Sequence, residues 1–401
     1  MIPFREALSA LISQARPAGR IETVPTLYAE SRILAEDIVS PVDVPPADNS
    51  QMDGYAVRSD DLARASAEAP VALPVSQRIP AGSVGERLAP GTAARIFTGA
   101  PLPEGADAVV QQELVETLED GSARFQAPVK PGCFVRPAGG DFKAGTVVLK
   151  KGEKLTPAKL GLAAGAGRAY VQVFGKVRAA IFCSGSELMR PGEAPRPGAI
   201  YDSNRYQLRA LLHGLGCEVE DIGSVPDSLE ATIEAFERAA RTADVIITTG
   251  GMSVGEEDHV KPAVRRLGSL AMWRLAVKPG KPFAFGEVKG IPFLGLPGNP
   301  VAVFVETLML VRPFLAVMQG QAPGEPRPIA IRADFDWQAG EREEFIRVRR
   351  NASGGLDRLP NQNSQILSSC AFADGIADVP AGRSLRKGDV VDYYPLAEIF
   401  A

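Results

Sequence analysis

The stretch Ala243-Asp244-Val245-Ile246-Ile247-Thr248-Thr249-Gly250-Gly251-Met252-Ser253-Val254-Gly255-Glu256-Glu257-Asp258 indicates how the largest domain folds. Residues 245–247 are apolar and β-branched, which is typical of a short strand buried on both faces of a sheet. The run ends at Gly250-Gly251, where a permissive backbone lets a ligand approach main-chain N–H groups. Ser253 adds a hydroxyl, and the start of a following helix favours an anion. The stretch therefore predicts a strand, a tight turn and a helix, with a loop suited to phosphate and followed by acids.

Two other interpretations of this loop are open. Residues 251–255 fit the pattern Gly-x-Ser-x-Gly, in which Ser253 would be the nucleophile of a hydrolase. Such a hydrolase needs an acid and then a histidine well downstream of the serine, but the histidines here are His213 and His259, and His259 follows Ser253 closely. The second alternative is a plain glycine-rich turn after a core strand, with no ligand.

The composition is typical of a soluble globular protein with several domains. The chain has 401 residues, of which 45% are hydrophobic and 23% charged. A net charge of −4 argues against nucleic acid or an anionic membrane as the main partner. No run of the sequence approaches the length of a membrane span or resembles a secretory signal. The widely spaced cysteines, which lack a metal-binding pattern, favour a reducing compartment; they are Cys133, Cys183, Cys217 and Cys370. We therefore expect a cytoplasmic protein.

Changes in pattern along the chain predict four domains. Apolar residues recur at helical spacing between Phe4 and Ile12, and a second helical stretch is expected over 28–38 before Pro41. Short strands between Gly and Pro turns follow, and a Pro-rich linker lies at 319–328. The predicted domains are a discontinuous N-terminal domain of residues 1–46 and 141–176, a small β-rich domain of 47–140, an α/β domain of 177–318 and a C-terminal β domain of 328–401.

Strands and helices alternate through the α/β domain, which is the signature of a doubly wound, mostly parallel sheet. Strands are expected at 178–183, 219–222, 245–247, 283–285 and 293–294, and helices at 205–212, 229–240, 259–267 and 301–311. Ligands of such sheets bind at the carboxyl ends of the strands. The polar runs 184–187, 226–227, 248–258 and 295–300 follow strands at that edge.

Several other runs are too polar and too rich in Gly and Pro for a core. Taken singly, Asp53-Gly54 and residues 95–101 fit plain turns, Lys278-Pro279-Gly280-Lys281 fits a solvated basic loop, and residues 296–300 fit a helix cap. Their joint order, however, resembles the molybdopterin molybdenumtransferase family, which includes MoeA and the gephyrin E domain. The runs that carry this resemblance across essentially the whole chain are 52–56, 98–100, 140–141, 184–188, 201–204, 249–258, 278–282 and 296–300.

The resemblance implies an enzyme that inserts molybdate into adenylyl-molybdopterin and releases AMP. Its substrates are anions, and acids beside a diphosphate suit Mg²⁺ between them. By similarity, the implied catalytic residues are Asp53, Thr98, Asp141, Glu187, Asp227, Asp258, Lys278 and Lys281, with Glu187, Asp227 and Asp258 on the metal. The implied substrate-binding residues are Asp202, Ser203, Asn204, Gly250, Gly251, Ser253, Gly255, Pro297, Gly298, Asn299, Pro300, Arg347 and Ser364. The two lysines, Arg347 and Ser364 would form the molybdate pocket, since an oxyanion needs fixed cationic donors.

The resemblance also implies a homodimer, because in the family Asp53, Thr98 and Asp141 come from the second subunit. The adenylyltransferase that supplies the substrate would be a further partner. Ala302 stands where family members often have a Ser, which removes one donor to molybdate. Two other functions stay open: a molybdopterin adenylyltransferase, although such proteins are much shorter, and a gephyrin-like scaffold, although here the acids and lysines are all retained.

Overall fold

The structure is a computed structural model that describes residues 1–252 and 258–399. The chain divides into two compact units, each built from separate segments. The α/β unit comprises Met1–Thr23, Ser31–Ala35 and Gln172–Ala401, and the N-terminal unit comprises Val24–Glu30 and Glu36–Val171. The predicted boundaries of four domains stay a prediction.

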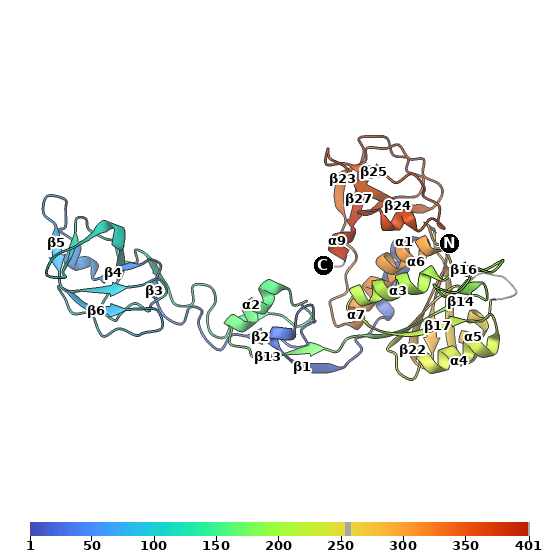
Figure 1. The fold of residues 1–401 in the computed structure, drawn as a ribbon, viewed down its shortest axis with the longest axis horizontal. Helices are drawn as coiled ribbons and strands as arrows, with labels where there is room; N and C mark the ends of the chain where they lie inside the picture. Colours follow the sequence, from blue (N-terminus) through green and yellow to red (C-terminus); the bar gives the residue numbers. More distant parts are fainter. Residues whose placement is uncertain (253–257, 400–401) are drawn as a thin grey trace. The chain divides into compact units, whose positions relative to one another are not determined.

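A mixed sheet forms the centre of the α/β unit, and Figure 1 labels its strands β14, β17 and β22. The full strand order is β17-β14-β18-β22-β21-β19. The parallel strands are β14 (Arg178–Ser184), β17 (Glu218–Val225), β18 (Val245–Thr249) and β22 (Ile291–Leu296). At one edge, β21 (Pro282–Val288) and β19 (Gly268–Arg274) are antiparallel. The prediction of a mostly parallel α/β sheet is confirmed.

Helices cover both faces of this sheet because its central strand is apolar on both sides. Val245 and Ile247 face one core, which they share with α1 (Phe4–Gln14), α3 (Ser203–Gly214), α6 (Pro300–Glu306), the π-helical segment η4 (Thr307–Val311) and α7 (Arg312–Met318). Ile246 faces the other core, with α4 (Leu229–Ala239) and α5 (Val260–Leu267). This alternation follows the two-residue period of a strand and holds the strand ends rigidly in place.

One helical stretch corrects a sequence-based expectation. Among the described residues, the 19-residue stretch Pro300–Met318 is long and apolar enough to cross a membrane by length and composition, and an 18-residue window within it has a mean hydropathy of 2.0. The sequence had been expected to contain no run of that length. This stretch is 89% buried within the protein, as a core helix of a folded domain is.

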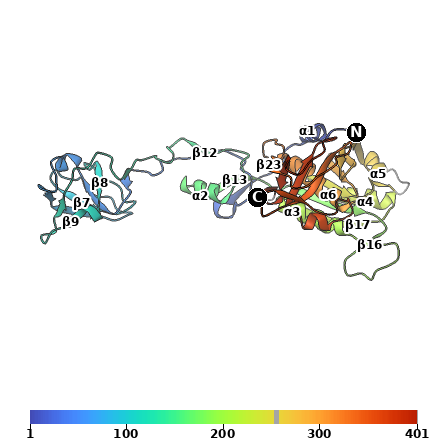
Figure 2. The ribbon, with the colours of Figure 1, turned by 90° about the horizontal axis from the view of Figure 1, so that it is seen from above.

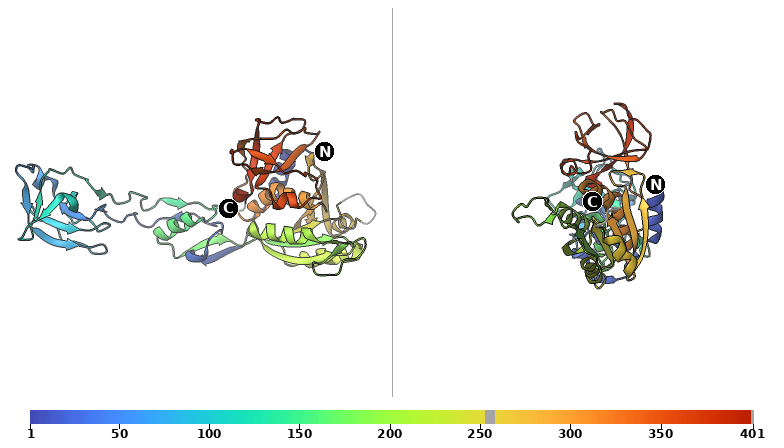
Figure 3. Two further views of the ribbon diagram at one scale, coloured as in Figure 1. Left: turned by 45° about the horizontal axis from the view of Figure 1, so that its top comes forward. Right: turned by 90° about the vertical axis from the view of Figure 1, so that its right-hand side faces the viewer.

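The C-terminal segment, red in Figure 3, forms a second sheet in the α/β unit together with β20. The strand order is β20-β24-β26-β27-β23. Its elements are β20 (Val277–Lys278), β23 (Ile329–Arg332), β24 (Glu343–Arg350), β25 (Leu356–Arg358), α8 (Ser368–Ala371), β26 (Gly375–Val379), β27 (Val390–Pro395) and α9 (Leu396–Ile399). Strand β20 pairs in parallel with β24, so Lys278 lies opposite Glu344. This pairing ties the lysine-containing turn to the C-terminal sheet.

A loop leaves the α/β unit between β15 (Leu188–Met189) and β16 (Ile200–Tyr201), and Figure 2 shows it projecting near β17. Strands β15 and β16 pair in parallel at its base, with Leu188 opposite Ile200. The loop therefore leaves and rejoins the unit at the end of β14.

The N-terminal unit is rich in short strands. Its larger sheets have the orders β6-β7-β4-β8 and β5-β10-β9. Its elements are β2 (Ile38–Val39), β3 (Asn49–Ser50), β4 (Gly54–Val57), η2 (Ser59–Leu62), β5 (Val71–Leu73), β6 (Val75–Ile79), β7 (Ala93–Ile96), β8 (Ala108–Gln111), η3 (Gln112–Leu114), β9 (Val115–Thr117), β10 (Ala123–Phe125), β11 (Val135–Arg136), β12 (Val147–Leu149) and α2 (Pro157–Gly165). In addition, β1 (Ile21–Pro25) pairs with β13 (Tyr170–Phe174).

The helix expected over 28–38 was wrong. A short 3-10 turn, η1 (Thr26–Tyr28), stands at its start, and the chain then continues without a helix to β2. Leu27 and Tyr28 are 79% and 75% exposed, whereas Leu34 is fully buried and bridges to Val173. The apolar side chains of this stretch therefore do not share one buried helical face, which a stable amphipathic helix requires.

Candidate active site

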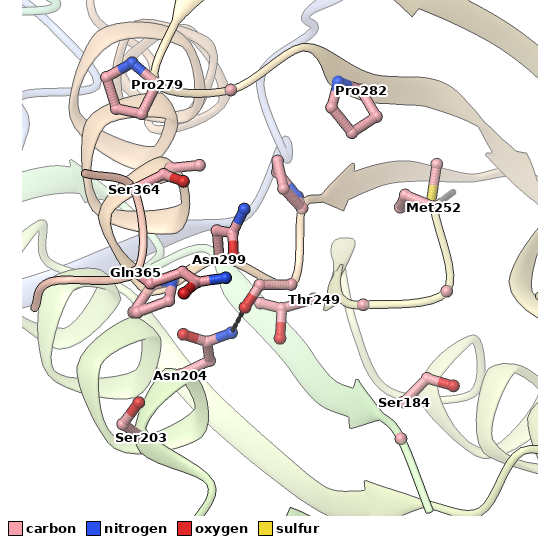
Figure 4. Close-up of a pocket in the computed structure, with 18 of the residues that line it drawn as sticks. Ser184, Ser203, Asn204, Thr249, Met252, Pro279, Pro282, Asn299, Ser364 and Gln365 are labelled. Carbon is pink, nitrogen blue, oxygen red and sulfur yellow. Dashed lines mark hydrogen bonds between the residues drawn. The ribbon is translucent and has the colours of Figure 1, made fainter. Parts of the chain in front are cut away.

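A pocket of about 1160 Å³ lies where the parallel strands β14, β18 and β22 end. Separate segments of the α/β unit line it, and Figure 4 shows Ser184, Thr249, Asn299 and Ser364 arranged around it. The predicted site residues that line it are Glu187, Asp202, Ser203, Asn204, Asp227, Gly250, Gly251, Asp258, Lys278, Lys281, Pro297, Gly298, Asn299, Pro300 and Ser364. The sequence therefore located this edge of the sheet correctly as the place where its polar runs meet.

The turn after β18 requires glycine at two consecutive positions. Gly250 has φ +82° and Gly251 has φ +63°, a backbone region that other residues rarely adopt. A Cβ atom on Gly250 would lie 2.4 Å from the Ser184 carbonyl oxygen, and one on Gly251 would lie 2.4 Å from a Val260 methyl group. The glycines therefore let the turn pass tightly between β14 and α5. Two predicted site residues of the same loop, Ser253 and Gly255, lie outside the described residues.

The three predicted metal-binding acids line the pocket in different environments. Asp227 accepts hydrogen bonds from the Ser184 hydroxyl at 3.1 Å and from the Ser186 amide at 2.8 Å. The Glu187 carboxylate packs against Gly185, where a Cβ atom would lie 2.5 Å from Oε2. Asp258 is the most enclosed, since its side chain is 7% exposed and Lys261 Nζ lies 3.2 Å from Oδ2. Burial raises the pKa of Asp258, and Lys261 opposes that shift.

Asp258 fits a cation that also binds a substrate. Among the described residues, no group of three or more His, Cys, Asp or Glu side chains converges to hold a metal ion. Mg²⁺, however, is commonly bound by one or two carboxylates together with substrate phosphates. Both Asp258 carboxylate oxygens are buried, and Oδ2 is ion-paired with Lys261 Nζ at 3.2 Å. Asp258 can therefore ligate Mg²⁺, while Glu187 and Asp227 stay predicted ligands.

The start of α3 and the Pro297–Pro300 turn form one wall of the pocket. Asp202 caps α3 by accepting from the Arg205 amide at 3.0 Å, and it also accepts from the Ser224 hydroxyl at 2.9 Å. Asn204 Nδ2 donates to the Gly298 carbonyl at 2.7 Å, as the dashed line in Figure 4 marks. Asn204 Oδ1 is buried without a hydrogen-bond partner among the described residues, so it is available to a donor on a ligand.

Lys278 and Lys281 give the opposite wall a positive charge. The two side chains flank Gly280, which has φ +97° and packs directly on the Glu306 carboxyl group. Glu306 is 2% exposed, and burial raises its pKa well above the usual value. Burial thus disfavours a negative charge on Glu306 directly under the turn, where such a charge would offset that of the lysines.

The structure supplies a cation that the sequence did not indicate. Arg342 lines the pocket and donates from Nη1 to the Val277 carbonyl at 3.0 Å, just before Lys278. Arg347, the arginine predicted to contact molybdate, does not line this pocket and is 1% exposed. It donates to the Phe345 carbonyl at 2.8 Å, and burial lowers its pKa to about 10. No local signal in the sequence marked Arg342, because its place at the pocket depends on the pairing of β20 with β24.

Asp53, Thr98 and Asp141 belong to the N-terminal unit, whereas every residue that lines the pocket belongs to the α/β unit. Thr98 donates to Asp53 Oδ1 from its amide at 2.8 Å and from its hydroxyl at 2.7 Å. These two hydrogen bonds lower the pKa of Asp53 and keep it ionised. Asp141 is exposed, and its amide donates to the Val44 carbonyl at 2.9 Å.

Gly280→Ala is expected to lower the affinity of the pocket for molybdate about tenfold, because a small displacement of charged groups is costly. The new Cβ atom would lie 2.2 Å from Glu306 Oε1, so the turn and its lysines must move. Isothermal titration calorimetry with molybdate measures the effect. Gly290→Ala is the matched control, since Gly290 has a similar φ of +84° with nothing within 4 Å of an added Cβ. Equal affinities in the two variants would show that Glu306 does not fix the turn.

Comparison with known proteins gives a consistent result across the chain. Residues 2–167 match the MoeA N-terminal region (domain I and II), 180–317 a probable molybdopterin-binding domain and 330–396 the MoeA C-terminal region (domain IV). A molybdopterin molybdenumtransferase of Haemophilus influenzae is 41% identical over 82% of this chain and 80% of the relative. Molybdopterin molybdenumtransferase 2 of Mycobacterium tuberculosis is 36% identical over 92% of this chain and 93% of the relative.

Solved structures extend this similarity to the fold. A crystal structure of a molybdopterin biosynthesis MoeA protein from Pyrococcus horikoshii has a TM-score of 0.86 and 30% sequence identity, and the match covers 98% of this chain and 100% of that one. A second MoeA structure from the same source has a TM-score of 0.83 and 34% identity, with 98% of this chain and 99% of that one covered.

Proposed function

Because this chain belongs to the molybdopterin molybdenumtransferase (MoeA) family, we propose that it inserts molybdate into adenylyl-molybdopterin and releases AMP in a Mg²⁺-dependent reaction. Family membership makes it a transferase of molybdenum cofactor biosynthesis. The observation that carries the finer proposal is a single pocket with acids at the strand ends and the Lys278–Lys281 turn on another wall. Such a pocket has separate places for a diphosphate with its cation and for an oxyanion.

The strand ends are suited to the diphosphate of adenylyl-molybdopterin. Gly250 and Gly251 have no side chains that would keep a phosphate away from the backbone. Asp258, with Glu187 or Asp227, would hold Mg²⁺, which when bound polarises phosphoryl oxygens and offsets the charge of the leaving AMP. The acids hold the diphosphate link in one orientation and so favour its cleavage.

The lysine turn is suited to molybdate. Lys278 and Lys281 supply positive charge, and Arg342 and Ser364 line the same pocket and add donors. The Ser364 carbonyl accepts from the Val301 amide at 3.1 Å, which holds Ser364 beside the start of α6. Fixed cationic donors hold the oxyanion beside the dithiolene that receives the metal, so transfer occurs within one pocket.

We further propose a cytoplasmic homodimer in which Asp53, Thr98 and Asp141 of one subunit complete the pocket of the other. These residues lie in the N-terminal unit, whereas the described residues that line the pocket all belong to the α/β unit. Free thiols at Cys133, Cys183, Cys217 and Cys370 support a reducing compartment. An adenylyltransferase is the class of partner that must supply the adenylated pterin.

The proposed reaction is tested by AMP release from adenylyl-molybdopterin. We expect AMP to form only when both molybdate and Mg²⁺ are present. Molybdate accepts the pterin thiolates, and Mg²⁺ neutralises the diphosphate. The measurement is chromatographic quantification of AMP with each component omitted in turn. Adenylylation of molybdopterin by ATP would instead support an adenylyltransferase. Authentic substrate that stays intact with folded enzyme, molybdate and Mg²⁺ would refute the proposed reaction.

A further inference from the structure

A buried acid, Glu344, lies directly behind one of the pocket lysines. Glu344 is 4% exposed, whereas the side chain of Lys278 is 46% exposed and lines the pocket. Glu344 Oε2 lies 3.3 Å from Lys278 Nζ, and the same oxygen accepts from Trp337 Nε1 at 3.1 Å. The other oxygen, Oε1, accepts from the Gly340 amide at 3.1 Å. The acid is thus held by the C-terminal sheet and directed at a pocket cation.

The described hydrogen-bond partners of Glu344 are all donors: Lys278 Nζ, Trp337 Nε1 and the Gly340 amide. Lys278 Nζ also lies 5.9 Å from the centroid of the Trp337 ring, so the ammonium group is held by a charge and by an aromatic face. Burial from water strengthens the interaction of the carboxylate with nearby charges.

The position of Glu344 is fixed by the pairing of β20 with β24, in which Lys278 lies opposite Glu344. The flanking Arg342 side chain fastens the same turn through the Val277 carbonyl. Burial lowers the pKa of Arg347, and the charge of Glu344 acts in the opposite direction. Glu344 therefore interacts with a second cation besides Lys278. A bound oxyanion at Lys278 would experience the positive charge of the lysine and the negative charge of this acid together.

We propose that Glu344 sets the affinity of the oxyanion site: it positions Lys278 at the pocket and offsets part of its charge. This inference rests on the proposed function, in which the anion is a substrate that must leave the lysines during transfer. Binding a substrate more tightly than its transition state slows the chemical step. An acid behind the lysine therefore keeps the anion oriented and still allows it to leave. Glu344 is a positioning residue rather than a catalytic one.

The test is molybdate affinity in the full-length Glu344→Gln variant, measured by calorimetry. Gln removes the negative charge and keeps the shape, so we expect the Kd for molybdate to fall about tenfold. The tightening should vanish when Glu344→Gln is combined with Lys278→Ala, because it acts through that lysine. It should persist with Lys281→Ala. The matched control is Glu341→Gln, an exposed acid on the same segment, which should leave the Kd within about twofold of the unaltered protein.

Trp337 provides a second readout. The chain has two tryptophans, so Trp273→Phe leaves Trp337 as the single indole. Molybdate should then change the fluorescence of Trp337, because the bound anion draws Lys278 away from Glu344 Oε2. The same oxygen accepts a hydrogen bond from Trp337 Nε1. If the Glu344→Gln variant does not fold, Trp337→Phe replaces it. That change removes a competing donor from Glu344, so molybdate affinity should fall while AMP affinity stays the same.

The possible outcomes separate this inference from the proposed function. An unaltered protein that does not bind molybdate would contradict the oxyanion site itself. Molybdate binding that is unchanged or weaker in Glu344→Gln, or tightening that survives Lys278→Ala, would overturn the role of Glu344 alone. With Trp337→Phe, unchanged molybdate affinity would also overturn it. Weakened AMP affinity in either variant would indicate general damage to the pocket and would count against a role specific to the oxyanion.

Discussion

Asp258→Ala is expected to reduce AMP release on the order of 10²-fold while leaving the melting temperature within about a few degrees. The Asp258 side chain is 7% exposed and lines the pocket, where Oδ2 is ion-paired with Lys261 at 3.2 Å. Burial raises the pKa of Asp258, because it disfavours the ionised carboxylate. A buried acid with a perturbed pKa that lines a pocket is suited to a cation or a substrate. Removing it should therefore affect chemistry more than folding.

Asp244→Ala is the matched control, because Asp244 is an acid immediately before β18 and both of its carboxylate oxygens accept hydrogen bonds. It accepts from Arg20 at 2.8 Å and from the Arg178 amide at 2.8 Å. Its loss should lower the melting temperature while the folded fraction keeps its activity per molecule. Differential scanning calorimetry together with AMP release distinguishes the two variants. A strongly destabilised Asp258→Ala protein with normal activity per folded molecule would make Asp258 a structural group.

Subunits carrying Asp53→Ala, mixed with subunits carrying Asp258→Ala, are expected to regain about a quarter of the unaltered specific activity. In a dimer with shared sites, a mixed pair combines the intact Asp258 of one subunit with the intact Asp53 of the other. An equal mixture makes about half of the dimers mixed, and each has one intact site of two. Each variant alone should stay near 1% of full activity, on the order of the 10²-fold loss above. The expected recovery is thus more than tenfold.

The measurement uses two affinity tags, so that subunit exchange is shown before activity is compared. Asp258→Ala mixed with Glu187→Ala is the control, because both residues line the same pocket of one chain. In a mixed dimer, each pocket would then lack one of the two acids. That mixture should recover activity only if Glu187 and Asp258 act in different sites. Absence of recovery with Asp53→Ala, despite complete exchange, would place Asp53 and Asp258 in one chain's site.

Local sequence signals predicted the candidate pocket because they depend on neighbours along the chain. The apolar run 245–247 predicted a strand covered on both faces, and β18 separates two cores in that way. The glycine pair after it predicted a turn with unusual backbone angles, which Gly250 and Gly251 adopt. Because parallel strands end at one sheet edge, the acids and the Pro297–Pro300 turn could be expected to meet there.

Other features depended on contacts between distant segments, and the sequence alone did not reveal them. Arg342 and Arg347 lie close together in sequence, but one lines the pocket and the other is 1% exposed. Glu344 in β24 resembles an ordinary strand residue until β20 pairs with that strand and sets Lys278 opposite. Glu306 belongs to an apolar helix, and only packing against Gly280 gives it a position under the lysine turn.

The sequence by itself determined the sheet, the edge where its polar loops meet and the family, because strand periodicity, glycine turns and ordered motifs are encoded locally. The tertiary structure decided which charged side chains reach the pocket and which support it from behind. That choice depends on strand pairing and burial between residues far apart in the chain, such as Lys278 and Glu344. Periodicity shows which face of a helix or strand is buried, but it does not show which element packs against that face. That neighbouring element determines whether a charged side chain can contact a ligand or is paired with another residue.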